Sequence, residues 1–187
     1  MLKPVLGVEE SVVLNFYNDQ EQNLVTTSVN ILSIYRVRPD DNDPSVKRLE
    51  LTDEYELWGN ICSICRVRFN GATKDSVLLS FEEAKCSIVE YEAETGGLHT
   101  VSMHFFQEDM LKRGFRKMNS MPLARVDAYQ RCASVLIYGK YLAILPFRRS
   151  HTGTGVAKSH AVSSFMINVE DLPRKMASVI DFQFLDG

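Results

Sequence analysis

Two cysteines at CxxC spacing, Cys62 and Cys65, are the residues whose types and spacing could hold a metal or exchange a disulfide. A zinc site would need a second pair of ligands, and a redox site would need a strand followed by a helix. The surrounding run 61–69 alternates like a β-strand, so we expect the two thiols to point to opposite faces of a sheet. With Cys86 and Cys132, they are predicted to be reduced thiols that pack as small apolar side chains.

The other combinations that could do chemistry are incomplete. His99 and His104 lie an odd number of residues apart in one strand-like run, so we expect them to face opposite ways. The acidic stretch 40–44 lacks the glycine and the distant glutamate of a calcium loop and is predicted to be a solvated loop. The stretch 152–155 has neither the P-loop lysine nor the full dinucleotide fingerprint. We therefore predict no catalytic residue, no metal and no cofactor.

Basic residues are the better candidates for a binding surface. Guanidinium and ammonium groups can neutralise phosphates, and an exposed aromatic ring can stack on an unpaired base. The alternative is a solvated turn with a buried phenylalanine anchor, and a protein partner fits these charges as well as RNA does. The candidate residues are Lys112, Arg113, Phe115, Arg116, Lys117, Arg148 and Arg149.

Composition excludes several classes of protein. The 187 residues are 45% hydrophobic and 24% charged, which is typical of a globular chain. The net charge of −3 gives no overall basic field that would attract nucleic acid. Neither an apolar run of ~18 residues nor the apolar core of a signal peptide is present, so the sequence predicts no membrane span and no export.

A repeated pattern predicts the elements that would position these residues. The stretches 23–35, 75–91 and 131–145 each consist of an apolar strand, a tight polar turn and a second apolar strand. Units of ~40–50 residues with several strands each are typical of propeller blades. We predict an all-β fold, a partial β-propeller of about three blades of four-stranded antiparallel sheets plus the start of another.

The remaining segments complete this prediction. Large apolar residues are expected to pack between the sheets, namely Trp58, Phe69, Phe81, Tyr91 and Phe106. We predict an opening strand at 11–16, short strands at 49–51 and 55–58, helices at 107–113 and 170–177, and a closing strand at 179–185. A closed propeller needs ~4–8 blades. We therefore expect residues 1–187 to be an N-terminal, incomplete propeller domain of a larger multi-propeller scaffold.

Longer strings of sequence carry a resemblance to a known family. The chain from about Asn15 onward resembles the N-terminal region of the largest subunits of the cleavage and polyadenylation specificity factor. The segment 111–117 is more basic than that family leads us to expect. The strings that carry the resemblance are 75–91, 114–115, 125–127, 131–133, 138–139, 145–148 and 180–187.

The resemblance implies a nuclear, non-enzymatic scaffold for pre-mRNA 3′-end cleavage and polyadenylation. It implies a WD-repeat subunit and a zinc-finger subunit as partners that make most of the contact with the polyadenylation signal. Pre-mRNA would then be bound mainly indirectly. The family is also similar to propeller subunits of ubiquitin ligases and of the spliceosome, so an adaptor role in one of those complexes is the alternative.

Overall fold

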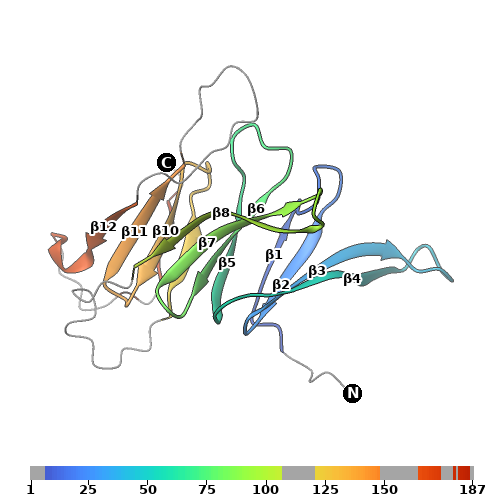
Figure 1. The fold of residues 1–187 in the computed structure, drawn as a ribbon, viewed down its shortest axis with the longest axis horizontal. Helices are drawn as coiled ribbons and strands as arrows, with labels where there is room; N and C mark the ends of the chain where they lie inside the picture. The colour runs from blue at the N-terminus through green and yellow to red at the C-terminus, as the bar shows by residue number, and fades with distance from the viewer. Residues whose placement is uncertain (1–6, 107–120, 148–163, 174–178, 180, 186–187) are drawn as a thin grey trace.

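Three antiparallel sheets of four strands make up the computed structural model, which describes residues 7–106, 121–147, 164–173, 179 and 181–185. Each sheet is a meander, because its strands are hydrogen-bonded in chain order. Figure 1 shows the three sheets side by side in the same order, from blue through green to orange. The predicted all-β fold of propeller-like four-stranded sheets is confirmed.

Sheet 1 is the first along the chain and contains the longest of the described strands, β4. Its strands β3 and β4 pair over nine residue positions, with one irregularity between Ile34 and Tyr35. Thr52 is the extra residue at this bulge, and its hydroxyl donates a hydrogen bond of 3.0 Å to the carbonyl oxygen of Ile34. The strands are β1 (Glu10–Leu14), β2 (Asn23–Ser28), β3 (Ile31–Pro39) and β4 (Lys47–Glu56).

The bulge corrects one prediction. The segments 49–51 and 55–58 were expected to be two short strands, but 47–56 forms the single strand β4. The alternation of apolar and polar residues breaks at Thr52 because a bulge places one extra residue in the strand. The break in the pattern therefore marks an irregularity inside a strand and not a strand end.

Sheet 2 lies between the other two sheets and is buried on both faces. All six residues of β6 are buried. Val77, Leu79 and Phe81 pack in the core shared with sheet 1, while Leu78 packs in the core shared with sheet 3. The strands of sheet 2 are β5 (Ile61–Val67), β6 (Ser76–Phe81), β7 (Lys85–Glu92) and β8 (Gly97–Phe105).

Sheet 3 contains two strands that the sequence did not predict. Both β9 and β12 have four residues, too few to establish an alternating pattern by themselves. They are positioned by pairing with the apolar central strands β10 and β11. The elements are β9 (Leu123–Val126), β10 (Cys132–Ile137), β11 (Tyr141–Pro146), β12 (Phe165–Asn168) and the 3₁₀ helix η1 (Val169–Asp171).

The same turn recurs in all three sheets. Between the second and third strands, Val29, Ala84 and Tyr138 have φ values of 56°, 51° and 52°. Tight hairpins require such positive φ values, and an L-residue adopts them only when the surrounding structure imposes them. This repeated turn is the structural counterpart of the repeat in the sequence.

The sheets follow one another as propeller blades do. The first strands of successive sheets lie in contact, β1 with β5 and β5 with β9. In a propeller the first strand of each blade faces the central axis, and blades pack face to face around it. Both inter-sheet cores contain aromatic side chains, but the core between sheets 2 and 3 also contains three buried alanines from sheet 3.

Two elements predicted near the end of the chain, a helix and a closing strand, do not form as predicted in the described residues. The predicted helix at 170–177 overlaps the 3₁₀ helix η1 only at residues 170–171, and residues 172–173 are not helical. The N–H of Glu170 donates to the Asn168 side chain at 3.1 Å. Residues 174–178 lie outside the described part of the chain. The predicted closing strand is wrong for residues 179 and 181–185, which are described and not in a strand. A strand requires a paired neighbour, and none of the described strands pairs with this segment. The predicted helix at 107–113 also lies outside the described residues.

Trp58 is a further correction. Phe69, Phe81 and Phe106 are buried and Tyr91 is half-buried, as predicted, but Trp58 is 92% exposed. Leu57 takes the inward position in the turn after β4 and packs against the core between sheets 1 and 2. Its neighbour in an extended chain must then point outward.

Candidate interaction surface

The basic residues predicted from the sequence cannot be compared with the structure. Lys112, Arg113, Phe115, Arg116 and Lys117 fall in 107–120, and Arg148 and Arg149 fall in 148–163. Both ranges lie outside the described residues. The candidate surface therefore has to be built from other parts of the chain.

The two CxxC cysteines have different hydrogen-bond partners. The thiol of Cys65 donates to the carbonyl oxygen of Ala124 at 3.2 Å, and that of Cys62 to Asn60 at 3.9 Å. Burial raises the pKa of Cys62 to about 12 and that of Cys65 to about 11, so both are protonated at neutral pH. All four cysteines are free thiols, as predicted.

The two histidines of β8, His99 and His104, lie against other side chains. His104 stacks on Phe106 with ring centroids 6.3 Å apart, and burial lowers the pKa of its imidazole. His99 lies 3.8 Å from a Glu90 oxygen. Among the described residues, no group of three or more His, Cys, Asp or Glu side chains could hold a metal ion.

The acidic loop 40–44 is only partly solvated, which corrects another prediction. Asp40 is buried, forms an ion pair with Arg48 and accepts a hydrogen bond of 2.8 Å from the backbone N–H of Asn42. Asp43 is exposed and accepts bonds from Ser45. Both carboxylates shape the turn between β3 and β4 through bonds to its backbone.

A buried carboxylate joins sheet 1 to sheet 2. Asp75, fully buried just before β6, accepts a hydrogen bond of 2.8 Å from the backbone N–H of Asn15. The backbone N–H of Asp75 donates in return to the Asn15 carbonyl oxygen at 2.8 Å. Arg66 and Arg68 neutralise the carboxylate at 2.9 and 3.0 Å. We call this set the Asp75 clasp.

Hydroxyl groups join sheet 2 to sheet 3. Ser63 and Ser80 lie 2.7 Å apart across β5 and β6, and both are buried. Ser80 donates to the Pro122 carbonyl oxygen at 2.6 Å, and the Ala124 N–H donates to Ser63 at 2.8 Å. These serine hydroxyls, which we call the serine latch, satisfy backbone groups of β9 and of the residue just before it.

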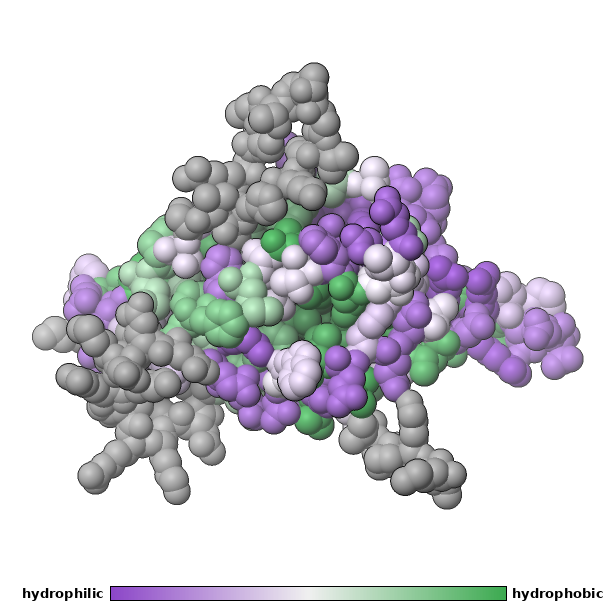
Figure 2. All heavy atoms as spheres, in the orientation of Figure 1, coloured by the Kyte–Doolittle hydropathy of each residue, from purple (hydrophilic) through white to green (hydrophobic). Residues whose placement is uncertain are grey.

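The hairpin of β3 and β4 is the most prominent projection among the described residues. Figure 1 shows it extending away from the three sheets, and Figure 2 shows that its far end is mostly hydrophilic. Val37 lies opposite Leu49, and Tyr35 lies opposite Leu51, so these four side chains share one face of the ribbon. Val37, Leu49 and Leu51 are each about half exposed. An exposed apolar strip of this kind is typical of a protein contact surface.

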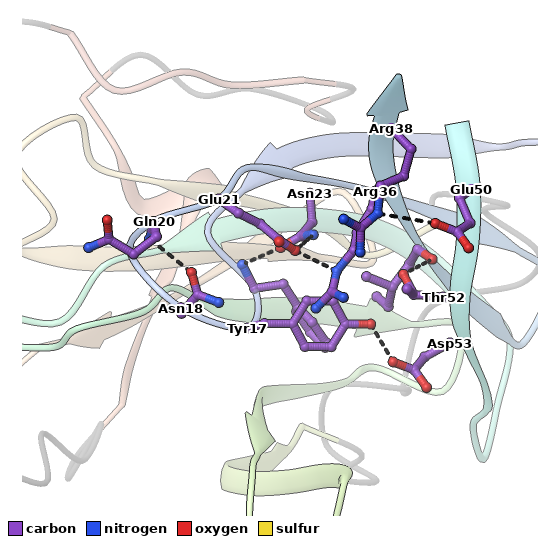
Figure 3. A network of polar contacts seen from close by, with 12 residues as sticks. Tyr17, Asn18, Gln20, Glu21, Asn23, Arg36, Arg38, Glu50, Thr52 and Asp53 are labelled. Atoms are coloured by element: carbon purple, nitrogen blue, oxygen red, sulfur yellow. Dashed lines mark hydrogen bonds and ion pairs between the residues drawn. The ribbon is translucent and has the colours of Figure 1, made fainter. Parts of the chain in front are cut away.

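The opposite face of the hairpin is held by a polar network (Figure 3). Arg36 pairs with Glu21 at 2.6 Å, and its guanidinium lies 4.5 Å from the centre of the Tyr17 ring. The Tyr17 hydroxyl donates to Asp53, and burial together with this bond raises the pKa of the tyrosine. Arg38 pairs with Glu50 at 3.3 Å.

An open groove of about 500 Å³ runs along this polar face. Three cations and one carboxylate line it, and two of the cations are paired, Arg36 with Glu21 and Arg38 with Glu50. The lining includes Glu21, Arg36, Arg38, Pro39, Pro44 and Lys47. The network fixes the base of the hairpin, and the apolar strip on its other face stays available for a partner. The sequence signal for the apolar strip is the alternation of apolar and charged residues in 35–38 and 48–51, from which strands were predicted but not an exposed contact surface.

Comparison with known proteins gives a consistent result. Residues 7–187 match the family model described as RSE1/DDB1/CPSF1 first beta-propeller. The chain is 34% identical to "Cleavage and polyadenylation specificity factor subunit 1" of Drosophila melanogaster over 97% of its own length and 14% of that protein. It is 31% identical to the Arabidopsis thaliana protein of the same name, over 98% of this chain and 16% of the relative.

A fungal relative extends the range. The chain is 30% identical to "Protein cft1" of Aspergillus fumigatus, over 76% of this chain and 12% of that protein. It thus spans about one-seventh of the length of the animal relative, and similarly small shares of the others.

Proposed function

Since the chain belongs to the RSE1/DDB1/CPSF1 first beta-propeller family, we propose that it is a scaffold module of the pre-mRNA 3′-end processing machinery. The observation that carries this proposal is the similarity to subunit 1 of the cleavage and polyadenylation specificity factor over nearly the whole chain. The proposed role is to assemble the subunits that recognise the polyadenylation signal.

The proposed activity is binding and not catalysis. Three buried polar side chains, Asp75, Ser63 and Ser80, are taken up by bonds that join sheets. The apolar strip of the β3–β4 hairpin, by contrast, has exposed side chains. Interior polar groups used for structure, combined with an exposed apolar projection, support a binding module.

The proposed partners are other subunits of the cleavage and polyadenylation complex, including WD-repeat and zinc-finger subunits, and the proposed compartment is the nucleus. Pre-mRNA would be contacted mainly through those subunits. A weaker, direct contact with RNA or a partner is proposed for Lys112, Arg113, Phe115, Arg116, Lys117, Arg148 and Arg149, on the strength of their charge alone.

We further propose that residues 1–187 form the first, incomplete part of a propeller within a larger scaffold. Sheet 2 has a core on each face, whereas sheets 1 and 3 each share a core with one described neighbour. Val13, on β1, is 53% exposed and its neighbour Val12 packs in the core. An additional blade on the outer face of sheet 1 would bury it.

Affinity purification from nuclear extract tests the proposed function. The full-length protein that contains this chain is tagged, and the captured proteins are identified by mass spectrometry. Subunits of the cleavage and polyadenylation complex are expected. Capture of ubiquitin-ligase or spliceosomal subunits in their place would overturn the proposal.

A matched pair of variants tests the hairpin within the same experiment. Leu49→Asp places a charge on the apolar strip and is expected to reduce capture of at least one subunit. Glu94→Gln, on the exposed turn between β7 and β8, is the control and is expected to leave capture unchanged. Equal capture by both variants would exclude the hairpin as a contact.

A further inference from the structure

Trp58 occupies the turn between sheets 1 and 2 and is 92% exposed. Strands of both sheets lie beside it in the described part of the chain, and its indole is exposed among them. The turn itself is well anchored: the N–H of Leu57 donates to Asn30 at 2.8 Å, and the Lys85 ammonium donates to the Trp58 carbonyl oxygen at 2.5 Å. An indole held outward on a fixed turn offers a large contact area at little conformational cost.

Carboxylates from separate segments surround this turn. The N–H of Glu82 donates to Asn60 at 3.1 Å, and a Glu82 carboxylate oxygen accepts from the Asn60 side chain at 3.0 Å. At Gly59, whose φ is +105°, an added Cβ would meet a Glu83 carboxylate oxygen at 2.8 Å and the Lys85 ammonium at 3.2 Å. The two glutamates therefore lie directly against the turn that carries Trp58.

Two more carboxylates come from sheet 1. Glu9 accepts a hydrogen bond of 2.8 Å from the N–H of Val29, and Glu56 accepts one of 3.3 Å from the Asn30 side chain. Val29 in turn accepts a bond of 2.7 Å from Ile61, which places this hairpin beside the start of β5. All four glutamates are exposed.

The charges at this edge are unbalanced. Beyond the larger effect of burial, Glu82, Glu83 and Glu9 each raise the pKa of Cys62, so their fields converge on the start of β5. Lys85 is a cation of this turn: its ammonium lies 4.0 Å from a Glu83 carboxylate oxygen, is bound to the Trp58 carbonyl oxygen and lies 4.3 Å from the centre of the Phe81 ring. Among these described residues, four carboxylates therefore face one ammonium. A surface of this sign repels phosphate groups and attracts cations.

We propose that the Trp58 face, made of Trp58, Glu9, Glu56, Glu82 and Glu83, binds an arginine- or lysine-rich segment of a partner protein. A guanidinium or ammonium group stacks on the indole, and neighbouring cations pair with the carboxylates. Tryptophan is among the residues that most often dominate the energetics of protein interfaces. The inference rests on the proposed role as a binding module, but not on the complex to which the chain belongs.

The test uses a fluorescein-labelled peptide of alternating arginine and glycine, whose binding to the full chain is followed by fluorescence anisotropy. Trp58→Ala is expected to weaken binding about fivefold, the loss of about 1 kcal/mol of cation–π attraction, and Trp58→Phe is expected to lose less. Glu82→Gln combined with Glu83→Gln is expected to weaken binding about threefold and to reduce its dependence on salt. Glu94→Gln is the matched charge control and is expected to bind as the unmodified chain does.

These side chains are exposed, so the variants are expected to keep the fold, which circular dichroism verifies. Absence of peptide binding, or equal affinity for the unmodified chain and Trp58→Ala, would overturn the proposal. A labelled single-stranded RNA is the second probe, and Trp58-dependent binding of that RNA would also overturn it. None of these results bears on the capture of complex subunits, so the proposed function stands or falls separately.

Discussion

The joint between sheets 1 and 2 and the joint between sheets 2 and 3 solve the same geometric problem with different chemistry. In each, the residue that follows the first strand donates its backbone N–H to a side chain of the next sheet. Asn15 donates to the Asp75 carboxylate at 2.8 Å, and Arg68 donates to the Gln130 amide oxygen at 2.7 Å. The first acceptor is charged and neutralised by two arginines, whereas the second is neutral.

The side chains packed at the two joints also differ. Phe16, Tyr17 and Tyr91 cluster at the first joint with ring centroids 4.7 to 5.9 Å apart. The second joint has one aromatic pair, Phe69 with Phe147 at 5.2 Å, brings Ala124 and Ala133 against sheet 2 and adds the serine latch. Small residues allow backbones to approach, so hydroxyl groups can reach the next strand directly. The blade geometry is thus repeated along the chain, while the chemistry that maintains it changes from one joint to the next.

Replacing the charged acceptor is expected to have the largest effect. Asp75→Ala leaves the buried N–H of Asn15 without an acceptor and removes the partner of Arg66 and Arg68. Because both arginines are partly exposed and can be hydrated, we expect a loss of about 3 kcal/mol in the free energy of unfolding. Urea denaturation of the full chain measures it, with Asp43→Ala on the exposed turn as the control. A loss no larger than that of the control would contradict the importance of the clasp.

The serine latch is expected to contribute less. Ser63→Ala leaves the buried N–H of Ala124 unsatisfied, at a cost of about 2 kcal/mol in the free energy of unfolding. Ser80→Ala removes the bond to Pro122, and the double variant should lose less than the sum because the two hydroxyls share one network. Strictly additive losses in urea denaturation would show that the hydroxyls act independently.

The neutral acceptor of the second joint is expected to matter less again. Gln130→Ala removes the bond to the Arg68 N–H, at a cost of about 1 kcal/mol in the free energy of unfolding. Residue 130 has a φ of 56°, which is as unfavourable for alanine as for glutamine, so backbone strain does not change the free energy of unfolding in Gln130→Ala. If Gln130→Ala cost as much as Asp75→Ala, charge would not be what distinguishes the two joints.

A change of pH tests Asp127, a buried carboxylate in the turn between β9 and β10. Hydrogen bonds from Arg131 lower the pKa of Asp127 from 3.8 to about 2. The stabilisation is therefore complete above about pH 4 and is lost as the pH falls toward 2. Arg131 is largely exposed, so we expect this to be the smallest effect. Asp127→Asn should flatten the pH dependence of the urea midpoint between pH 4 and 2, and an unchanged slope would contradict the assignment.

The predicted part of the fold is the part with local signals. Strands β2, β3, β6, β7, β10 and β11 were predicted because their apolar runs flank tight polar turns. Strands β9 and β12 are short and depend on pairing with strands elsewhere in the chain. The clasp joins Asn15 to Asp75 across 60 positions of sequence, a relation that no local pattern encodes.

Side-chain exposure was harder to predict than strand position. Trp58 was expected in the core because large aromatic residues are usually buried, yet the neighbouring Leu57 takes the inward position. Asp40 was expected in solvent because it lies in an acidic loop, yet it is buried against Arg48. In both cases a single neighbour decides the outcome.

Immunodepletion from a nuclear extract tests the assignment to the 3′-end processing machinery most directly. The full-length protein containing this chain is removed, and cleavage of a reporter pre-mRNA at its polyadenylation site is measured before and after the purified protein is restored. We predict that depletion abolishes cleavage and that restoration recovers it. Cleavage that continues undiminished after complete depletion would contradict the assignment.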